Sequence, residues 1–258
     1  MWRRWSCSQV RYKAVFFDVG NTLLYPYPSV EAICAEVLAN HGYNVSLGRL
    51  AEALSRADEY YEEKYREDDT FWLSEERAVS LWTDLYTLVM MEVGLSADPI
   101  HPAGGGGGKS EASGMAREIY DEFGHSERWR TYPDVLPVLR ELKERGFILG
   151  IISNWDTRLP SLCVELGFSP LLSFVIASAA VGSLKPQPCI FELGLWRAGV
   201  EASEAIHVGD HYYADVMGAR CVGITPILID REKRGIKSDC PVIESLDELL
   251  SCNLLRTG

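Results

Sequence analysis

The 258-residue sequence predicts an α/β fold in which a parallel β-sheet is interrupted, after its first strand, by a block of helices. Two patterns predict it. After residue 133, short runs that are apolar throughout alternate with helical segments, which is typical of a parallel sheet covered by helices on both faces. Residues 28–130 show only the helical spacing of apolar side chains, so we expect no strand there that could join a sheet.

The first strand is expected at residues 13–18, an apolar and aromatic run that ends at Val19-Gly20-Asn21. A helix should begin behind Ser29 and end at His41-Gly42. Two longer amphipathic helices are expected at residues 50–65 and 74–93. The first strand therefore belongs with the later strands, and the helices between them form an insertion.

The second half of the chain supplies the rest of the expected sheet. Strands are expected at residues 147–153, 174–177, 205–208 and 224–229. Helices are expected at residues 134–145, 157–166, 186–198 and 214–221. Pro186 suits the first turn of its helix, and Ser245 with Glu248 forms a capping box that opens a last helix.

Composition and charge exclude several classes of function. The formal net charge is −12 and no basic stripe is present, which argues against a nucleic-acid partner. No apolar run approaches the roughly 20 residues that span a bilayer. The seven cysteines form no C-x-x-C pair, so we expect reduced thiols and a cytoplasmic protein. The basic N-terminus lacks the apolar segment of a secretory signal, although it leaves a weak organelle-targeting signal open.

A glycine-rich run at residues 103–110 nearly spells a phosphate-binding loop. Such a loop must follow a buried strand, and here residues 98–102 contain two prolines instead. We therefore expect a flexible connection within the helical block.

Polar side chains follow the predicted strands, where a parallel sheet places its ligands. Asp18 follows the first strand, Ser153-Asn154 the second and Gly209-Asp210 the fourth, and Lys185 lies a loop beyond the third. With Asp215, three carboxylates should converge at one edge, where they repel unless a cation neutralises them. Oxygen ligands alone favour a hard ion such as Mg²⁺, and an ion beside a lysine can hold a phosphate group.

These motifs resemble those of the haloacid dehalogenase superfamily of hydrolases. In order they are Phe17-Asp18-Val19-Gly20-Asn21-Thr22, Ile152-Ser153-Asn154, Lys185-Pro186, and Gly209-Asp210 followed by Asp215. The chain is most similar to the branch of rhythmically expressed gene 2 and the haloacid dehalogenase-like hydrolase domain-containing proteins. The resemblance implies a Rossmann-like core at residues 11–26 and 131–258 and an all-helical cap at residues 27–130.

The resemblance also implies roles for particular residues. Asp18 would be the nucleophile that forms an aspartyl-phosphate, and Lys185 would hold the phosphoryl group and offset the charge of Asp18. Mg²⁺ would be held by Asp18, the backbone carbonyl of Gly20, Asp210 and Asp215. The side chains expected to bind a small phosphorylated metabolite are those of Ser153, Asn154, Lys185 and Thr22.

One position departs from the pattern of the superfamily. Most of its phosphatases carry a general acid/base aspartate where this chain has Gly20, and such help is typically worth ~10²–10⁴-fold. His211 is a candidate replacement. Three alternatives stay open: a 2-haloacid dehalogenase, a carbon–phosphorus hydrolase with Lys64 forming a Schiff base, and a non-catalytic protein that binds phosphate ligands or other proteins.

Two further patterns are expected to be structural. His207 lies inside an apolar strand and should be a hydrogen-bonded core residue. The aromatic stripe should pack between the helices of the insertion, with some rings facing the substrate; it comprises Tyr60, Tyr61, Tyr65, Phe71 and Trp72.

Overall fold

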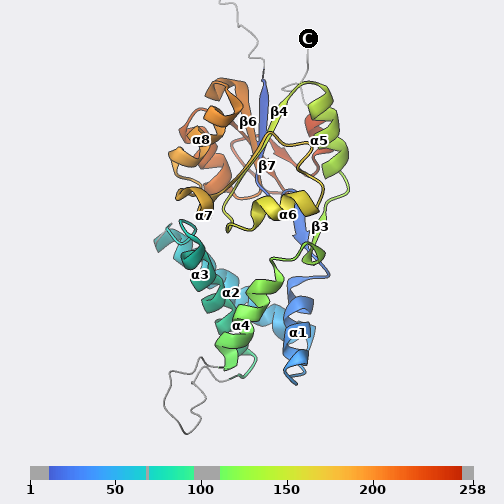
Figure 1. Ribbon diagram of the computed structural model, residues 1–258, viewed down its shortest axis with the longest axis vertical. Coiled ribbons are helices and arrows are strands. Elements are labelled where there is room, and N and C mark those ends of the chain that lie inside the picture. The colour runs from blue at the N-terminus through green and yellow to red at the C-terminus, as the bar shows by residue number, and fades with distance from the viewer. Residues whose placement is uncertain (1–11, 68–69, 96–110, 252–258) are drawn as a thin grey trace, which may run out of the picture.

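The computed structural model describes residues 12–67, 70–95 and 111–251 and shows a six-stranded, all-parallel sheet flanked by helices (Figure 1). The strand order is β5-β4-β1-β6-β7-β8. The strands are β1 (Ala14–Phe17), β4 (Ile148–Ser153), β5 (Phe174–Ala177), β6 (Ala205–Gly209), β7 (Thr225–Ile229) and β8 (Val242–Ile243). This sheet confirms the predicted α/β fold class. The glycine-rich run at 103–110 and the basic N-terminal residues lie outside the described residues.

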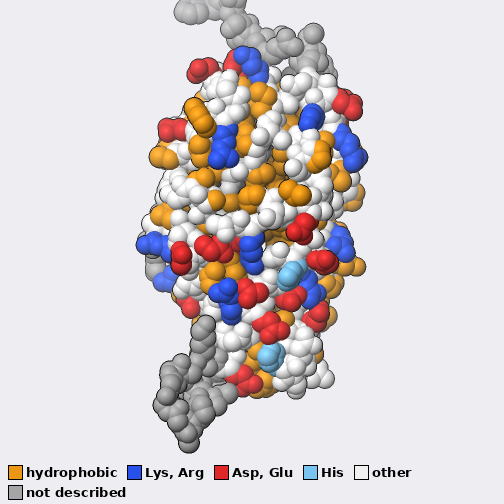
Figure 2. Space-filling view, viewed as in Figure 1, with side chains coloured by type: hydrophobic (Ala, Val, Ile, Leu, Met, Phe, Trp, Pro, Cys, Tyr) orange, Lys and Arg blue, Asp and Glu red, His pale blue; other side chains and the backbone are white. Residues whose placement is uncertain are grey.

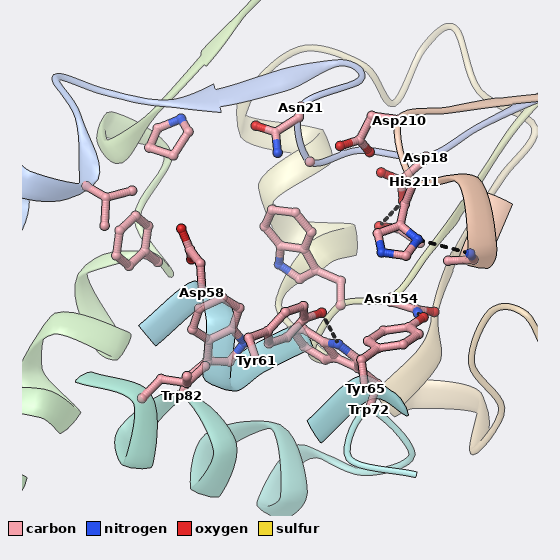
Figure 3. Close-up of a pocket in the computed structure, with 18 of the residues that line it drawn as sticks. Asp18, Asn21, Asp58, Tyr61, Tyr65, Trp72, Trp82, Asn154, Asp210 and His211 are labelled. Carbon is pink, nitrogen blue, oxygen red and sulfur yellow. Dashed lines mark hydrogen bonds between the residues drawn. The ribbon is translucent and has the colours of Figure 1, made fainter. Parts of the chain in front are cut away.

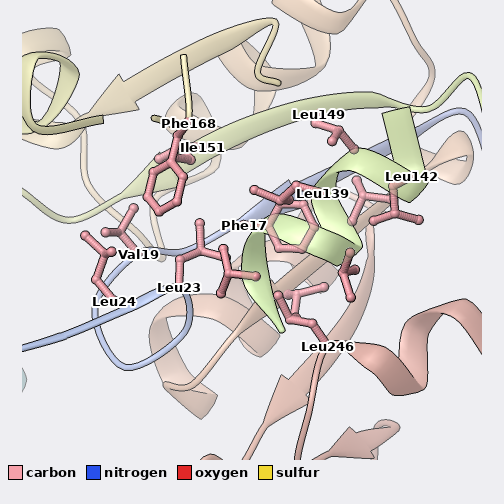
Figure 4. Packing of buried hydrophobic residues seen from close by; sticks show 14 of the residues in the cluster. Phe17, Val19, Leu23, Leu24, Leu139, Leu142, Leu149, Ile151, Phe168 and Leu246 are labelled. Carbon is pink, nitrogen blue, oxygen red and sulfur yellow. The ribbon is translucent and has the colours of Figure 1, made fainter. Parts of the chain in front are cut away.

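Both faces of the sheet are covered, because successive side chains of each buried strand point to opposite sides. Val15 and Phe17 pack with α5 (Val135–Glu144), α6 (Leu159–Glu165) and α10 (Asp247–Ser251) (Figure 4). Ala14 and Phe16 pack on the other side with α8 (Pro188–Ala198) and α9 (Gly218–Cys221). Since these strands are buried on both faces, they read as uninterrupted apolar runs in the sequence.

Four α-helices of the described residues lie between β1 and β4, below the sheet in Figure 1. They are α1 (Val30–Asn40), α2 (Leu47–Glu67), α3 (Glu75–Glu92) and α4 (Glu111–Glu122). Ser29 and Ser74 cap α1 and α3 through their side-chain hydroxyls, as a serine before an apolar period predicts. The four helices share one hydrophobic cluster, which also includes Leu184 and Ala214 of the sheet domain. The domain limits at residues 27 and 130 stay a prediction.

The expectation that residues 28–130 contain no strand able to join a sheet is wrong for the last two residues of that range. Strand β3 (Trp129–Thr131) pairs antiparallel with β2 (Leu24–Pro26) in a separate two-stranded sheet. These two strands form where the chain enters and leaves the four helices. Three residues are too few to show a period of two, so sequence periodicity could not reveal either strand.

Two helix starts also differ from expectation. Helix α8 begins at Pro188, and Pro186 precedes it, joined to Lys185 by a cis peptide bond. The helix expected at residues 214–221 begins instead with a π-helical turn, η3 (Tyr212–Met217), and continues as α9. His211 caps this turn because its Nδ1 accepts a hydrogen bond from Ala214 N at 3.1 Å.

No described helix is both long enough and apolar enough to cross a membrane. On the face in Figure 2, acidic and basic side chains are interspersed over the lower half of the molecule rather than separated by sign. The described cysteines, Cys34, Cys163, Cys189, Cys221 and Cys240, are all free thiols.

Candidate active site

The predicted site residues gather at the carboxyl ends of the central strands. The chain leaves β1 toward β4 on one side and leaves β6 toward β7 on the other, so the topological switch point lies between β1 and β6. Asp18 and Asp210 directly follow these two strands. Ligands of open α/β sheets bind in the crevice at such a point. Ser153 ends β4, and Lys185 reaches the site from the loop between α7 (Ser178–Val181) and α8.

Lys185 joins two carboxylates in the interior of the site. Its Nζ lies 2.5 Å from Asp18 Oδ1 and 2.5 Å from Asp215 Oδ1, and its side chain is 2% exposed. Ser153 Oγ donates to Asp18 Oδ1 at 2.9 Å. Burial raises the pKa of Asp18, Lys185 opposes the rise, and Asp215 adds to it. Burial disfavours the Lys185 ammonium, but Asp18 and Asp215 outweigh it and hold the pKa of Lys185 above its usual value.

The Asp215 carboxylate has three partners. Besides Lys185, His207 Nε2 lies 2.8 Å from its Oδ1, and His211 N donates to its Oδ2 at 3.0 Å. Burial opposes ionisation of Asp215, yet Lys185 and His207 lower its pKa below the usual value. The expectation that His207 is a hydrogen-bonded core residue is met at Nε2, whereas Nδ1 is buried with no partner among the described residues. Burial lowers the pKa of His207.

Gly209 is required by this packing. A β-carbon at Gly209 would lie 2.1 Å from Asp215 Cγ, a distance that no pair of nonbonded carbons tolerates. The Gly209-Asp210 pair therefore leaves room for the Asp215 carboxylate and places Asp210 at the end of β6.

Three carboxylates form a set of possible metal ligands. One oxygen from each of Asp18, Asp210 and Asp215 lies within 4.8 Å of the others. Burial raises the pKa of Asp210 to about 8, with Asp18 and Asp215 adding to the rise. Three carboxylates lie beside the single ammonium of Lys185, which therefore does not offset the acidic charge alone. Oxygen-only donors and a shortage of positive charge both fit a hard divalent cation.

The remaining predicted residues divide into two groups. Asn154 and Gly20 line the same cavity as the carboxylates. Thr22 does not line it: its side chain is fully buried, its Oγ1 has no partner among the described residues, and its carbonyl accepts hydrogen bonds from Arg231. Lys64 lies over the Tyr60 ring and is not part of the cavity wall.

Tyr65 of α2 connects the helical insertion to the site, a role that the sequence did not reveal. Its hydroxyl donates to the carbonyl of Lys185 at 2.7 Å and accepts from Asn154 Nδ2 at 2.8 Å. Asn154 in turn bonds both the N–H and the carbonyl of Lys185. His211 stacks on Tyr65, with ring centroids 5.4 Å apart. The backbone of Lys185 is thus fixed from both sides.

The sequence also did not reveal a second contact between the insertion and the sheet domain. Glu75, at the start of α3, accepts hydrogen bonds from the N–H and hydroxyl of Thr157 at 2.9 and 2.7 Å. Tyr120 of α4 donates to Asp156 Oδ2 at 3.1 Å, and Arg158 pairs with the same carboxylate at 2.8 Å. Asn154, Asp156, Thr157 and Arg158 therefore all bond residues of the insertion, which only the packing of distant segments reveals.

The site opens into a cavity of about 620 Å³ between the strand ends and the insertion (Figure 3). Asp18, Asp210 and His211 lie at one side of it in this view, and Asp58, Tyr61 and Trp82 lie at the other. This volume is within the range of about 300–1,000 Å³ typical of small-molecule sites.

Several proteins of known name are similar to this chain in sequence. The chain is 36% identical to "Haloacid dehalogenase-like hydrolase domain-containing protein 3" of Danio rerio over 52% of this chain and 57% of that protein, so this match spans little more than half of the relative. It is 31% identical to the Homo sapiens protein of the same name, over 86% of this chain and 83% of that one. It is 30% identical to a glyceraldehyde 3-phosphate phosphatase of Methanopyrus kandleri, over 86% and 85%.

A solved structure shares the fold. The HAD-hydrolase YfnB of Bacillus subtilis, solved with bound magnesium, aligns over 96% of this chain and 100% of its own with a TM-score of 0.75 and 15% identity. The family described as haloacid dehalogenase-like hydrolase matches residues 12–223. With the carboxylate and lysine motifs at the strand ends, this match shows that the chain belongs to the haloacid dehalogenase-like hydrolases.

Proposed function

We propose that this hydrolase is a Mg²⁺-dependent phosphatase that cleaves a small phosphate monoester through an aspartyl-phosphate on Asp18. The observation that carries the proposal is the Asp18 carboxylate, which is bonded by Lys185 and Ser153 and lies beside two further carboxylates at a cavity. Relatives named as phosphatases support the reaction class.

The chain's own groups supply a two-step reaction. An oxygen of Asp18 attacks phosphorus, the bond from phosphorus to the leaving oxygen breaks, and the leaving alkoxide takes up a proton from the acid/base group, which the attacking water restores in the second step. Water then attacks the aspartyl-phosphate and releases inorganic phosphate and the free carboxylate. Lys185 offsets charge on the phosphoryl oxygens, Ser153 donates a hydrogen bond to them, and Asn154 holds the backbone of Lys185 in place.

The ligands proposed for Mg²⁺ are Asp18, Asp210, Asp215 and the carbonyl of Gly20. When bound, the ion would neutralise negative charge on the transferred phosphoryl group. Asp215 has a second task, because its short contact with Lys185 fixes the ammonium beside Asp18. Gly20 brings no acid or base, and His211, which lines the cavity, stays the candidate for proton transfer.

We propose that the four helices at residues 27–130 form a cap over this cavity. The contacts of Tyr65 with Lys185 and of Glu75 with Thr157 support it, since they join insertion and site directly. A closed cap excludes water from the reacting groups and selects the substrate.

Phosphate release from p-nitrophenyl phosphate, with and without Mg²⁺, tests the proposal. We expect metal-dependent turnover that falls by about 10³-fold or more in Asp18→Asn. Asp121→Asn is the matched control, because Asp121 is an exposed acid in an i,i+4 pair with Arg117. Turnover without added metal in EDTA, or wild-type activity in Asp18→Asn, would contradict the proposal.

The absence of an acidic side chain at Gly20 favours one other candidate, a non-catalytic protein that keeps the phosphate site. Its signature is a phosphorylated Asp18 that accumulates without multiple turnovers, detected by intact mass spectrometry. Chloride release from 2-chloropropionate would instead identify a dehalogenase.

A further inference from the structure

The cavity beside Asp18 has an aromatic wall on the side of the insertion. Consecutive ring contacts, with centroids 5.0 to 6.0 Å apart, join Tyr61, Trp82, Tyr86, Phe123, Trp129 and Trp155. All six line the cavity. The wall comes from helices α2 and α3, from β3 and from the loops after α4 and β4. A leaving group in this space meets ring faces and edges over much of the wall.

The positive side chains of the described cavity wall are already paired. Lys185 bonds Asp18 and Asp215, Arg158 bonds Asp156, and Arg234 lies 3.4 Å from Asp230. Lys185 and Arg158 cannot meet a second anionic group of a substrate without breaking an existing pair. Arg234 is 55% exposed, and Asp230 and Glu232 both lie beside its Nε and offset its charge. A carboxylate or second phosphate on the leaving group would therefore meet no uncompensated cation in the described part of the wall.

Negative charge is instead available on the cavity face of α2. Asp58 lines the cavity and has neither an ion-pair nor a hydrogen-bond partner among the described residues. It lies across the cavity from Asp18 and Asp210 in Figure 3. Glu62, one turn further along α2, also lines the cavity, and its Oε1 is 3.6 Å from His211 Nε2. Burial raises the pKa of Asp58, and Glu62 and Glu31 add to the rise, as expected where no cation compensates.

We propose that the preferred substrate is a phosphate monoester whose leaving group carries a positively charged nitrogen, held by the aromatic wall and Asp58. Aromatic faces attract ammonium groups through the ring quadrupole, and a carboxylate on the same wall adds a direct charge partner. The phosphate would occupy the Asp18 end and the ammonium the Asp58 end. This inference rests on the proposed phosphatase function and names its substrate class.

Three esters that differ in the charge of the leaving group test the inference. They are phosphocholine, its uncharged isostere 3,3-dimethylbutyl phosphate, and the anionic phosphoglycolate. We expect kcat/KM for phosphocholine to exceed that for the isostere by about tenfold, the effect of a cation on aromatic faces beside a carboxylate. Phosphoglycolate should be the poorest of the three.

Two variants assign the preference to the cavity. Asp58→Asn should lower the ratio of phosphocholine to isostere by about three- to tenfold. Asp84→Asn, an exposed acid of α3 that does not line the cavity, should leave that ratio unchanged. Trp82→Leu should lower the ratio as well, because it removes one ring of the wall.

The outcomes separate this inference from the function on which it rests. If p-nitrophenyl phosphate is hydrolysed with Mg²⁺ but the isostere or phosphoglycolate is preferred, the inference fails and the phosphatase function stands. If no ester is hydrolysed, the phosphatase function fails. Calorimetric binding of phosphocholine and its isostere then tests whether the cavity prefers a cationic ligand, which equal affinities would overturn.

Discussion

Arg231 is expected to be a major contributor to stability, although it lies outside the catalytic motifs. Its guanidinium pairs with Asp134 Oδ2 at 2.6 Å and donates twice to the carbonyl of Thr22, at 3.2 and 2.7 Å. The two side chains of the pair are 7% and 9% exposed. The guanidinium also lies 4.2 Å from the centroid of the Tyr132 ring. One residue thus joins the end of β7, the start of α5 and the loop behind Asp18.

Replacing Arg231 by methionine should lower the free energy of unfolding by about 3–5 kcal/mol. A hydrogen bond between charged groups is worth about 1.5–3 kcal/mol, the bonds to Thr22 about 1 kcal/mol, and the ring contact about 0.5–1 kcal/mol. The sum agrees with the roughly 3–5 kcal/mol lost when one partner of a buried pair is removed. It is a large share of a typical stability of about 5–15 kcal/mol.

Urea unfolding followed by tryptophan fluorescence at pH 7 measures this loss. Arg220→Met is the matched control, because it breaks an exposed ion pair with Asp239. The side chain of Arg220 is 38% exposed and that of Asp239 is 61% exposed. This variant should lower the free energy of unfolding by less than about 1 kcal/mol. A loss below about 1 kcal/mol for Arg231→Met would refute the reasoning, since the buried pair would then behave like the exposed one.

The same pair predicts a pH dependence. Burial acts to raise the pKa of Asp134, but hydrogen bonds from Arg231, Ser245 and Leu246 outweigh it and hold the pKa below its usual value. A carboxyl group whose pKa is lower in the folded state stabilises the fold above its unfolded pKa, about 3.9. This contribution is lost as the pH falls through the lower folded-state value. The stability difference between wild type and Asp134→Asn should therefore shrink below about pH 4, and a constant difference would contradict the assignment.

Three further substitutions test the site and its support. Gly209→Ala should reduce p-nitrophenyl phosphate turnover by about 10²-fold or more, because the new methyl group displaces the Asp215 carboxylate. The circular dichroism spectrum of this variant should stay native. Near-wild-type turnover would show that Asp215 can move without loss of activity. Tyr65→Phe removes the hydrogen bonds to the Lys185 carbonyl and to Asn154 and should lower kcat/KM by about tenfold. The control variant Tyr60→Phe should leave kcat/KM unchanged. Equal effects of the two variants would exclude a specific role for the Tyr65 hydroxyl. Gly150→Ala would place a β-carbon 2.2 Å from the Phe174 ring. The free energy of unfolding should fall by about 1–3 kcal/mol, which lowers the midpoint of thermal unfolding. An unchanged midpoint would mean that the ring can move aside without cost.

Short-range patterns in the sequence predicted five of the six sheet strands and the acidic cluster, whereas the two-residue strand β8 was too short to predict. A strand buried on both faces is apolar throughout, as at Ala14–Phe17, and a serine before a helical period predicts a cap, as at Ser29. Because parallel strands end at one edge, residues that follow them can be assigned to one site without knowledge of the strand order. Asp18, Ser153, Lys185, Asp210 and Asp215 were found in this way.

Only the tertiary structure decided which segments meet across the site. Periodicity reports that a side chain is buried but does not identify its neighbour, so the bond from Tyr65 to Lys185, 120 residues later, could not be predicted. The β2–β3 ribbon and the contact of Glu75 with Thr157 have the same origin. The aromatic wall and the place of Asp58 in it likewise arise from the packing of α2 and α3 against the strand ends. The sequence thus determined which polar side chains gather at the strand ends, and the three-dimensional packing determined the cavity beside them.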